Sequence, residues 1–126
     1  MQEGWCTNMT YKEFSRLYDQ AVELLEYENE EYYVAREWEE WMDEYEDNVD
    51  IIIEILRKTY RYARGNISEL RMDMQMSVPV FGRFFGIPRR TIQDWEYGKN
   101  NVSGYIKKMM VYIGLMEQIQ EKIMDV

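Results

Sequence analysis

Carboxylates are the side chains in this sequence that could carry out acid–base chemistry. They occur in adjacent pairs, such as Glu30 with Glu31 and Glu39 with Glu40. Neighbouring residues of a helix diverge by about 100°, so such pairs are more typical of a solvated face than of a catalytic acid and base. Histidine is absent and Cys6 is the single cysteine, which excludes histidine-based catalysis, histidine metal sites and thiolate zinc clusters. We therefore expect a protein that is not an enzyme and that binds no metal or cofactor.

The segment 77–98 predicts two short helices joined by a tight turn. Ser77 can cap the first helix, Gly86 suits the left-handed position at its end, and Pro88 suits the first turn of the second helix. Between these signals lie apolar residues that could pack the two helices together: Phe81, Phe84, Phe85, Ile92 and Trp95. Two short helices that meet at a steep angle form a helix-turn-helix, whose second helix commonly reads the major groove of DNA.

The same stretch resembles the Cro/C1-type (XRE-like) helix-turn-helix family, in particular its small phage and mobile-element members. The resemblance is carried by the run Gly86-Ile-Pro-Arg-Arg-Thr-Ile-Gln-Asp-Trp-Glu-Tyr-Gly98. It extends upstream to Ile67-Ser-Glu-Leu-Arg71 and downstream to about residue 120, so that it covers roughly residues 66–120. The resemblance implies double-stranded DNA as the partner and a role in transcriptional regulation.

The resemblance also implies roles for individual polar residues. It places Arg89 and Arg90 at the base edges of the groove, with Asp94 one turn later and Gln93 toward the flank. Arginine is a bidentate partner of guanine, whereas aspartate accepts only from cytosine N4 and otherwise repels phosphate. Residues that would touch the DNA backbone follow in the next loop and, as a possible addition, in a lysine pair: Lys99, Asn100, Asn101, Lys107 and Lys108.

Two features depart from the family's pattern. The first helix begins Val78-Pro79-Val80, where family members commonly place a polar residue that contacts phosphate, and proline removes a backbone donor at the same point. After the loop, the chain has Val102-Ser-Gly-Tyr105 where relatives often have Pro-Pro-Glu-Tyr. The alternative interpretation of Arg89 and Arg90 is a pair of solvated surface charges.

Charge divides the chain into two unlike halves. Residues 1–56 contain 17 acidic and three basic side chains, a net charge of −14, whereas residues 57–126 contain 12 basic and seven acidic ones, a net charge of +5. The basic half suits a polyanion, and the acidic half would be repelled by one. We therefore predict two domains, an acidic one over residues 1–65 and a helix-turn-helix domain over residues 66–126.

The acidic half predicts a helical hairpin. Thr10 and Glu13 form a capping-box pattern, after which apolar residues recur at spacings of three and four. The first helix either runs from about residue 11 to 46 or breaks near residues 27–30. A second helix runs from about residue 49 to 63 and ends before Gly65.

Aromatic residues lie among carboxylates between residues 27 and 46. One interpretation places the aromatics in the core and the acids on a solvated face. The other is a protein-binding surface, because Tyr and Trp anchor many interfaces and closely spaced carboxylates resemble a phosphate backbone. The residues of that surface would be Glu30, Glu31, Glu37, Glu40, Glu44, Tyr33 and Trp41. Small acidic phage proteins, including anti-CRISPR proteins, use such mimicry, and residues 1–65 are similar to them in architecture only.

A long helix from about residue 103 to 124 completes the expected all-α fold, and its apolar stripe serves either core packing or homodimerisation. No apolar run approaches the ~18 residues of a membrane span, and the N-terminus lacks a signal-peptide pattern. With a lone cysteine, these features favour a cytoplasmic protein. The sequence therefore predicts a DNA-binding transcriptional regulator of phage or mobile-element type whose acidic hairpin binds a protein partner. The alternative is an anti-CRISPR or anti-restriction inhibitor that blocks a basic nucleic-acid-handling protein.

Overall fold

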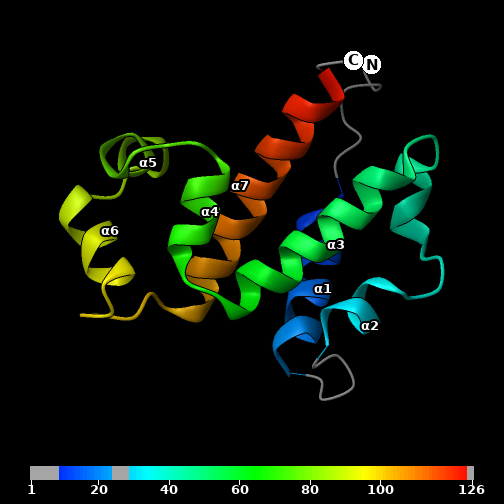
Figure 1. Ribbon diagram of the computed structural model, residues 1–126, viewed down its shortest axis with the longest axis horizontal. Helices are drawn as coiled ribbons and strands as arrows, with labels where there is room; N and C mark the ends of the chain where they lie inside the picture. The colour runs from blue at the N-terminus through cyan, green and yellow to red at the C-terminus, as the bar shows by residue number, and fades with distance from the viewer. Residues whose placement is uncertain (1–8, 24–28, 125–126) are drawn as a thin grey trace.

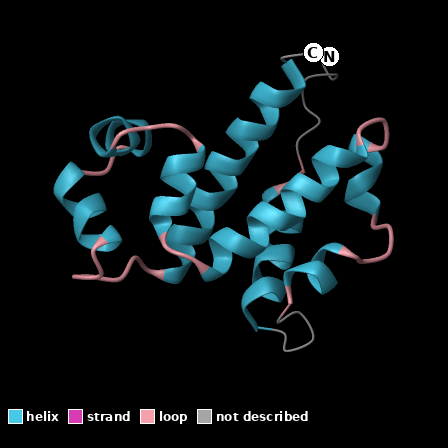
Figure 2. Cartoon of the chain, in the orientation of Figure 1, coloured by secondary structure: helices cyan, strands magenta, loops and turns pink. Residues whose placement is uncertain are grey.

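The computed structural model describes residues 9–23 and 29–124, which form helices joined by short loops (Figure 1 and Figure 2). In chain order the helices are α1 (Tyr11–Glu23), α2 (Glu30–Val34), the 3₁₀-helix η3 (Glu40–Tyr45), α3 (Val49–Arg64), α4 (Ile67–Asp73), α5 (Val78–Phe85), α6 (Arg89–Glu96) and α7 (Gly104–Met124). No strand occurs in the two described ranges, which confirms the expected all-α fold. None of the described helices is both long and apolar enough to cross a membrane. Cys6 lies outside the described residues.

A local capping motif sets the start of α1. The Thr10 hydroxyl accepts a hydrogen bond from the Glu13 amide at 3.2 Å, and the Glu13 carboxylate accepts one from the Thr10 amide at 3.3 Å. The predicted capping box is therefore formed. Helix α3 occupies the range that the sequence predicts, but Asn48 makes no side-chain capping hydrogen bond and Gly65 is extended rather than left-handed.

Residues 29–45 do not continue α1 as one long helix, so the predicted helix from 11 to 46 is wrong. The Asn29 side chain accepts hydrogen bonds from the amides of Glu31 at 2.7 Å and Tyr32 at 3.3 Å, and it thereby starts α2 as a separate helix. After α2, residues 36–39 run without helix before η3 begins. The predicted alternative was a break near residues 27–30, of which residues 27 and 28 lie outside the described residues.

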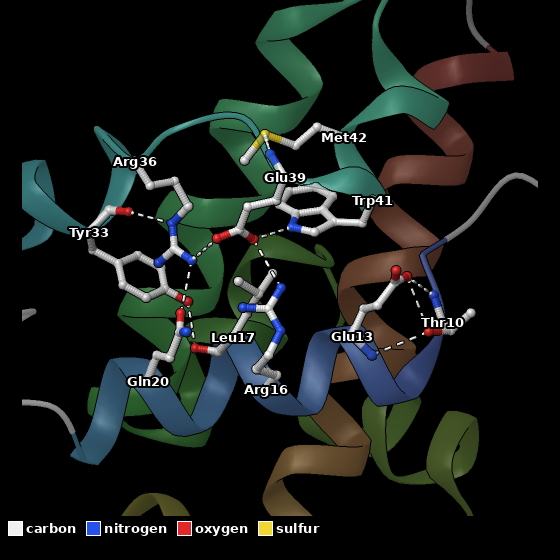
Figure 3. Close-up of polar contacts among 10 residues, drawn as sticks. All are labelled: Thr10, Glu13, Arg16, Leu17, Gln20, Tyr33, Arg36, Glu39, Trp41 and Met42. Carbon is white, nitrogen blue, oxygen red and sulfur yellow. Dashed lines mark hydrogen bonds and ion pairs between the residues drawn. The ribbon is translucent and has the colours of Figure 1, made fainter.

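A polar network docks this segment on α1 (Figure 3). The Tyr33 hydroxyl donates a hydrogen bond of 2.6 Å to the Leu17 carbonyl. The Glu39 carboxylate accepts hydrogen bonds from Arg16 at 3.0 Å, Arg36 at 3.2 Å and Trp41 at 2.8 Å. Burial raises the pKa of Glu39, but the hydrogen bonds from Arg16 and Trp41 outweigh it and leave the pKa below its usual value. A continuous helix would not bring these groups together, because Glu39 and Trp41 are two residues apart and would point to nearly opposite sides of it.

A shared hydrophobic core connects the two predicted domains. Helix α3 packs against α1, α2 and α7, and α7 also packs against α1 and α4. Fully buried core residues come from both sides of the predicted boundary: Phe14, Leu17, Ile55, Leu115 and Ile119. Gly114 lets α7 approach α4 closely, since a Cβ there would lie 2.7 Å from Leu70 Cδ1. The core therefore spans the predicted domain boundary between residues 65 and 66. Helices α5 and α6 lie at one end of the long axis of the molecule (Figure 1).

Candidate nucleic-acid interface

Helices α5 and α6 are joined by a left-handed glycine turn. The Ser77 hydroxyl accepts a hydrogen bond from the Val80 amide at 3.4 Å and caps α5. Gly86 ends α5 with φ at +71°, a conformation that costs other residues about 1 kcal/mol or more. The predicted roles of Ser77 and Gly86 are therefore confirmed. Pro88 lies directly before the first residue of α6 rather than within its first turn.

Apolar side chains fix how α5 and α6 pack. Phe81 and Ile92 are fully buried, and Phe85 and Trp95 are half-buried against the core. The rings of Phe81 and Phe85 meet edge to face, with centroids 4.9 Å apart. Four of the five predicted packing residues therefore contact the core, and Phe84 is 39% exposed.

An ion pair that the sequence does not predict connects α4 to α6. Arg71 donates to both carboxylate oxygens of Glu96, at 2.6 and 3.0 Å, and also to the Met76 carbonyl at 3.1 Å. The hydrogen bonds to Glu96 raise the pKa of Arg71. Asn66, which caps α4, donates to the Glu96 carbonyl at 3.2 Å. These contacts fix α6 relative to the core. The only sequence signal was the presence of opposite charges in two neighbouring short helices.

Most of the residues predicted to contact DNA reach solvent. Five of them are exposed: Arg89, Arg90, Lys99, Asn100 and Asn101. Gln93 and Asp94 are half-buried. Asp94 lies 3.9 Å from Arg90 between Oδ1 and Nε, one helical turn away. The aspartate therefore holds Arg90 loosely and leaves its side chain 81% exposed.

Backbone hydrogen bonds hold the loop after α6 against the end of that helix. The amides of Lys99 and Asn100 donate to the Asp94 carbonyl at 2.9 and 3.4 Å. Gly98 makes this return possible with φ at +78°. The Lys99 side chain thus starts from a fixed backbone position beside α6.

Lys107 and Lys108, predicted as a possible addition to the DNA contacts, are engaged within the protein. Lys107 Nζ donates to the Gly65 carbonyl at 2.6 Å, and burial lowers the pKa of this lysine. Lys108 Nζ pairs with Asp19 at 2.9 Å and donates to the Ser15 hydroxyl, also at 2.9 Å. Both lysines link the start of α7 to neighbouring helices, a role that a charge count along the sequence does not distinguish from phosphate contact.

The basic residues of the C-terminal half fall into two groups. One group is engaged in ion pairs or donates to backbone carbonyls: Arg57, Lys58, Arg61, Arg64, Arg71, Lys107, Lys108 and Lys122. The other group comprises Arg83, Arg89, Arg90 and Lys99. Among the described residues, the only ion pair of this group is the 3.9 Å contact between Arg90 and Asp94. The available positive charge of this half therefore lies on α5, α6 and the loop that follows.

The predicted protein-partner surface is only partly present. Tyr33 is fully buried and Trp41 is 2% exposed, so neither side chain can anchor a partner. Glu30 accepts hydrogen bonds from Arg61 at 2.9 Å and Arg57 at 2.7 Å, with Arg61 the larger cause of its lowered pKa. Glu31 also pairs with Arg57, at 2.8 Å, and its pKa is lowered as well. These pairs neutralise the charge that the prediction assigned to Glu30 and Glu31.

The remaining carboxylates gather on what we call the acidic segment, residues 37–50. Within the described residues, seven of its acids are exposed and make no ion pair: Glu37, Glu40, Asp43, Glu44, Glu46, Asp47 and Asp50. Burial and, second, the nearby Glu13 carboxylate raise the pKa of Glu44. Trp38, 53% exposed, donates to Asp43 at 2.7 Å in the same segment. The short helix η3 of this segment lies at the opposite end of the molecule from α5 and α6 (Figure 1).

Comparison of the chain with protein-family models, with curated proteins and with solved structures gives no match. Within residues 9–23 and 29–124, no group of three or more cysteine, aspartate or glutamate side chains is arranged to hold a metal ion.

Proposed function

We propose that this protein is a sequence-specific DNA-binding regulator of the phage or mobile-element type that acts in the cytoplasm through an α5–α6 helix-turn-helix. The observation that supports this most strongly is the distribution of positive charge: the basic residues left without a firm partner in the C-terminal half all lie on α5, α6 and the following loop. DNA-binding affinity depends mainly on such cations, because each neutralised phosphate releases counterions.

In this proposal, α6 enters the major groove and the loop after it touches the backbone. Arg90 is exposed in the first turn of α6, where a guanidinium can bond two acceptors of guanine. Asp94, 3.9 Å away, limits the orientations of Arg90 and can accept from cytosine N4. Lys99 and Asn100 are exposed in the loop and supply donors for phosphate. The Arg71–Glu96 ion pair holds α6 in position for these contacts.

The test is a titration of the purified protein with labelled duplexes that tile the region upstream of its gene, at ~50 to 200 mM salt. We expect one duplex to bind selectively and its affinity to fall steeply with salt. Arg89→Ala with Arg90→Ala should weaken that binding by roughly 30-fold or more, because two base or phosphate contacts are lost. Lys12→Glu changes the net charge by the same amount on exposed α1 and should weaken binding far less. Absence of any duplex binding at 50 mM salt would refute the proposal.

A second candidate function is inhibition of a DNA-handling protein through the acidic segment. The supporting observation is the seven exposed carboxylates that make no ion pair within the described residues. They can attract the basic groove of an anti-CRISPR or anti-restriction target. Cleavage assays with RNA-guided nucleases and restriction enzymes test this. Replacing Glu37, Glu40 and Glu44 by lysine should abolish inhibition yet spare DNA binding, and inhibition that survives the three changes would exclude this surface.

Homodimerisation is the quaternary arrangement we propose for DNA binding. Tyr105, Met109 and Ile113 recur every four residues along α7 and are 69%, 44% and 47% exposed. A stripe of this kind can pair with its copy about a two-fold axis, and paired half-sites are common in readers of this type. Sedimentation should show a dimer that Met109→Glu converts to a monomer; a wild-type monomer on a single half-site would contradict the arrangement.

A further inference from the structure

A groove runs between α5 and the start of α6, on the side where their connecting turn lies. It is open to solvent, has a volume of about 480 Å³, and is lined by Arg83 and Arg89 together with Pro79, Gly82, Gly86, Ile87 and Pro88. Two of its lining residues are therefore cationic, and none is acidic. The floor is apolar or backbone, so the groove offers an anion two guanidinium groups and no competing carboxylate.

The shape of the groove is set by backbone contacts. The Ile87 amide donates to the Gly82 carbonyl at 2.8 Å and the Gly86 amide donates to the Arg83 carbonyl at 3.3 Å, which together form a Schellman closure. Gly82 permits this approach, since a Cβ there would lie 2.6 Å from the Ile87 carbonyl oxygen. The two arginines therefore project from backbone positions that are fixed relative to each other.

Both arginine side chains are available to a ligand. Arg83 and Arg89 are exposed, and neither makes an ion pair or side-chain hydrogen bond with the described residues. The start of α6 adds donors, because Pro88 supplies no side-chain cap and the first amides of a helix lack intrahelical acceptors. Guanidinium groups beside free helix amides suit a phosphodiester, whose oxygens accept from a planar fork of N–H groups.

We propose that Arg83 and Arg89 together hold one backbone phosphate of the DNA strand beside the groove that α6 reads. This assignment rests on the proposed DNA-binding function and gives the arginines separate roles. Arg83 and Arg89 position the protein on the DNA backbone, and Arg90 contacts the base. This assignment also supplies a phosphate contact that the start of α5 cannot make, because Val78, Pro79 and Val80 carry no side-chain donor.

The test compares wild type, Arg83→Ala and Arg83→Lys on the selected duplex and on a scrambled duplex. Arg83→Ala should lower the slope of log affinity against log salt by about 0.9, so that its defect shrinks about 3.5-fold between 50 and 200 mM salt. The loss should be equal on both duplexes, since a phosphate contact carries no sequence information. Arg83→Lys keeps the charge and should keep the wild-type slope. Lys12→Ala, which removes one exposed charge from α1, should also keep it.

The outcomes separate this inference from the function on which it rests. If wild type binds selectively but Arg83→Ala keeps the full salt slope, the phosphate assignment is wrong and the DNA-binding function stands. If Arg83→Ala weakens only the selected duplex, Arg83 reads sequence and the assignment is again wrong. If wild type binds no duplex, both proposals fail. Matched melting temperatures confirm that the exposed substitution leaves the fold intact.

Discussion

The Arg71–Glu96 ion pair should be worth more than the surface ion pairs of this protein. The Arg71 side chain is 18% exposed and the Glu96 side chain 11%. Fully exposed pairs typically contribute up to about 1 kcal/mol, whereas removing one partner of a fully buried pair costs about 3–5 kcal/mol. Two hydrogen bonds of 2.6 and 3.0 Å and this degree of burial place the pair between those limits.

Glu96→Gln removes the charge and turns an amide NH₂ group toward the guanidinium. We expect the free energy of unfolding to fall by about 2–3 kcal/mol, because a partly buried Arg71 loses its counter-ion and one good acceptor. Arg71→Met should cost a similar amount, since it also removes the donor to the Met76 carbonyl. In the double variant the two losses should overlap, which gives a coupling energy of about 1.5–2 kcal/mol.

The assay is urea unfolding at pH 7, followed by far-UV circular dichroism, for wild type, both single variants and the double variant. The Arg61–Glu30 pair serves as the control, because the Arg61 side chain is 58% exposed and its coupling should stay below about 1 kcal/mol. Equal coupling energies in the two cycles, or an Arg71–Glu96 coupling below about 0.5 kcal/mol, would refute the reasoning from burial.

Three further predictions concern the turn, an ion pair and a buried tyrosine. Gly86→Ala should destabilise the fold by about 1 kcal/mol in urea unfolding and Gly86→Asn by less, because only the positive φ opposes a side chain there. Burial raises the pKa of Glu54, but hydrogen bonds from Lys122 and Lys58 outweigh it and lower the pKa below its usual value. That stabilisation is complete above the usual glutamate pKa. It is lost as the pH falls through the lowered pKa that Glu54 has in the folded protein. Glu54→Gln should therefore cost about 1 kcal/mol at pH 7 and nothing near pH 2, and a constant difference across that range would contradict the assignment. Tyr33→Phe removes a buried hydroxyl that donates to a carbonyl of α1, and it should lower stability by about 1 kcal/mol, with unchanged stability as the contrary result.

Local chemistry made the helix ends predictable from the sequence. The Thr10 capping box, the Ser77 cap and the left-handed Gly86 each depend on residues within three or four positions, so their geometry follows from residue type and spacing. One of the two alternatives, a single long helix over 11–46, failed for the opposite reason. Its aromatic spacing is helical, but Tyr33 is buried with its hydroxyl bonded to the Leu17 carbonyl of α1, a contact between distant segments that periodicity does not encode.

Charge was the least predictable property at the level of single residues. A lysine in a sequence carries the same signal whether it contacts solvent, a carboxylate or a backbone carbonyl. Lys107 and Lys108 were therefore expected beside Lys99, yet they cap and pair with neighbouring helices, while Lys99 stays exposed. The half-chain totals predicted a division of charge, and the tertiary pairing decided which residues retain it.

That pairing changes what the net charge of −9 means for DNA binding. The acidic segment ends in the first turn of α3. The other end of α3 is followed by Asn66, which donates to the Glu96 carbonyl of α6. Sixteen helical residues at 1.5 Å each separate the two regions by about 24 Å, roughly three Debye lengths at 0.15 M salt. At that salt concentration a duplex against α6 is largely screened from the carboxylates of residues 37–50, and it interacts mainly with the basic residues left available on α5, α6 and the following loop. The formal charge therefore opposes binding strongly only in dilute salt, where the Debye length approaches 30 Å.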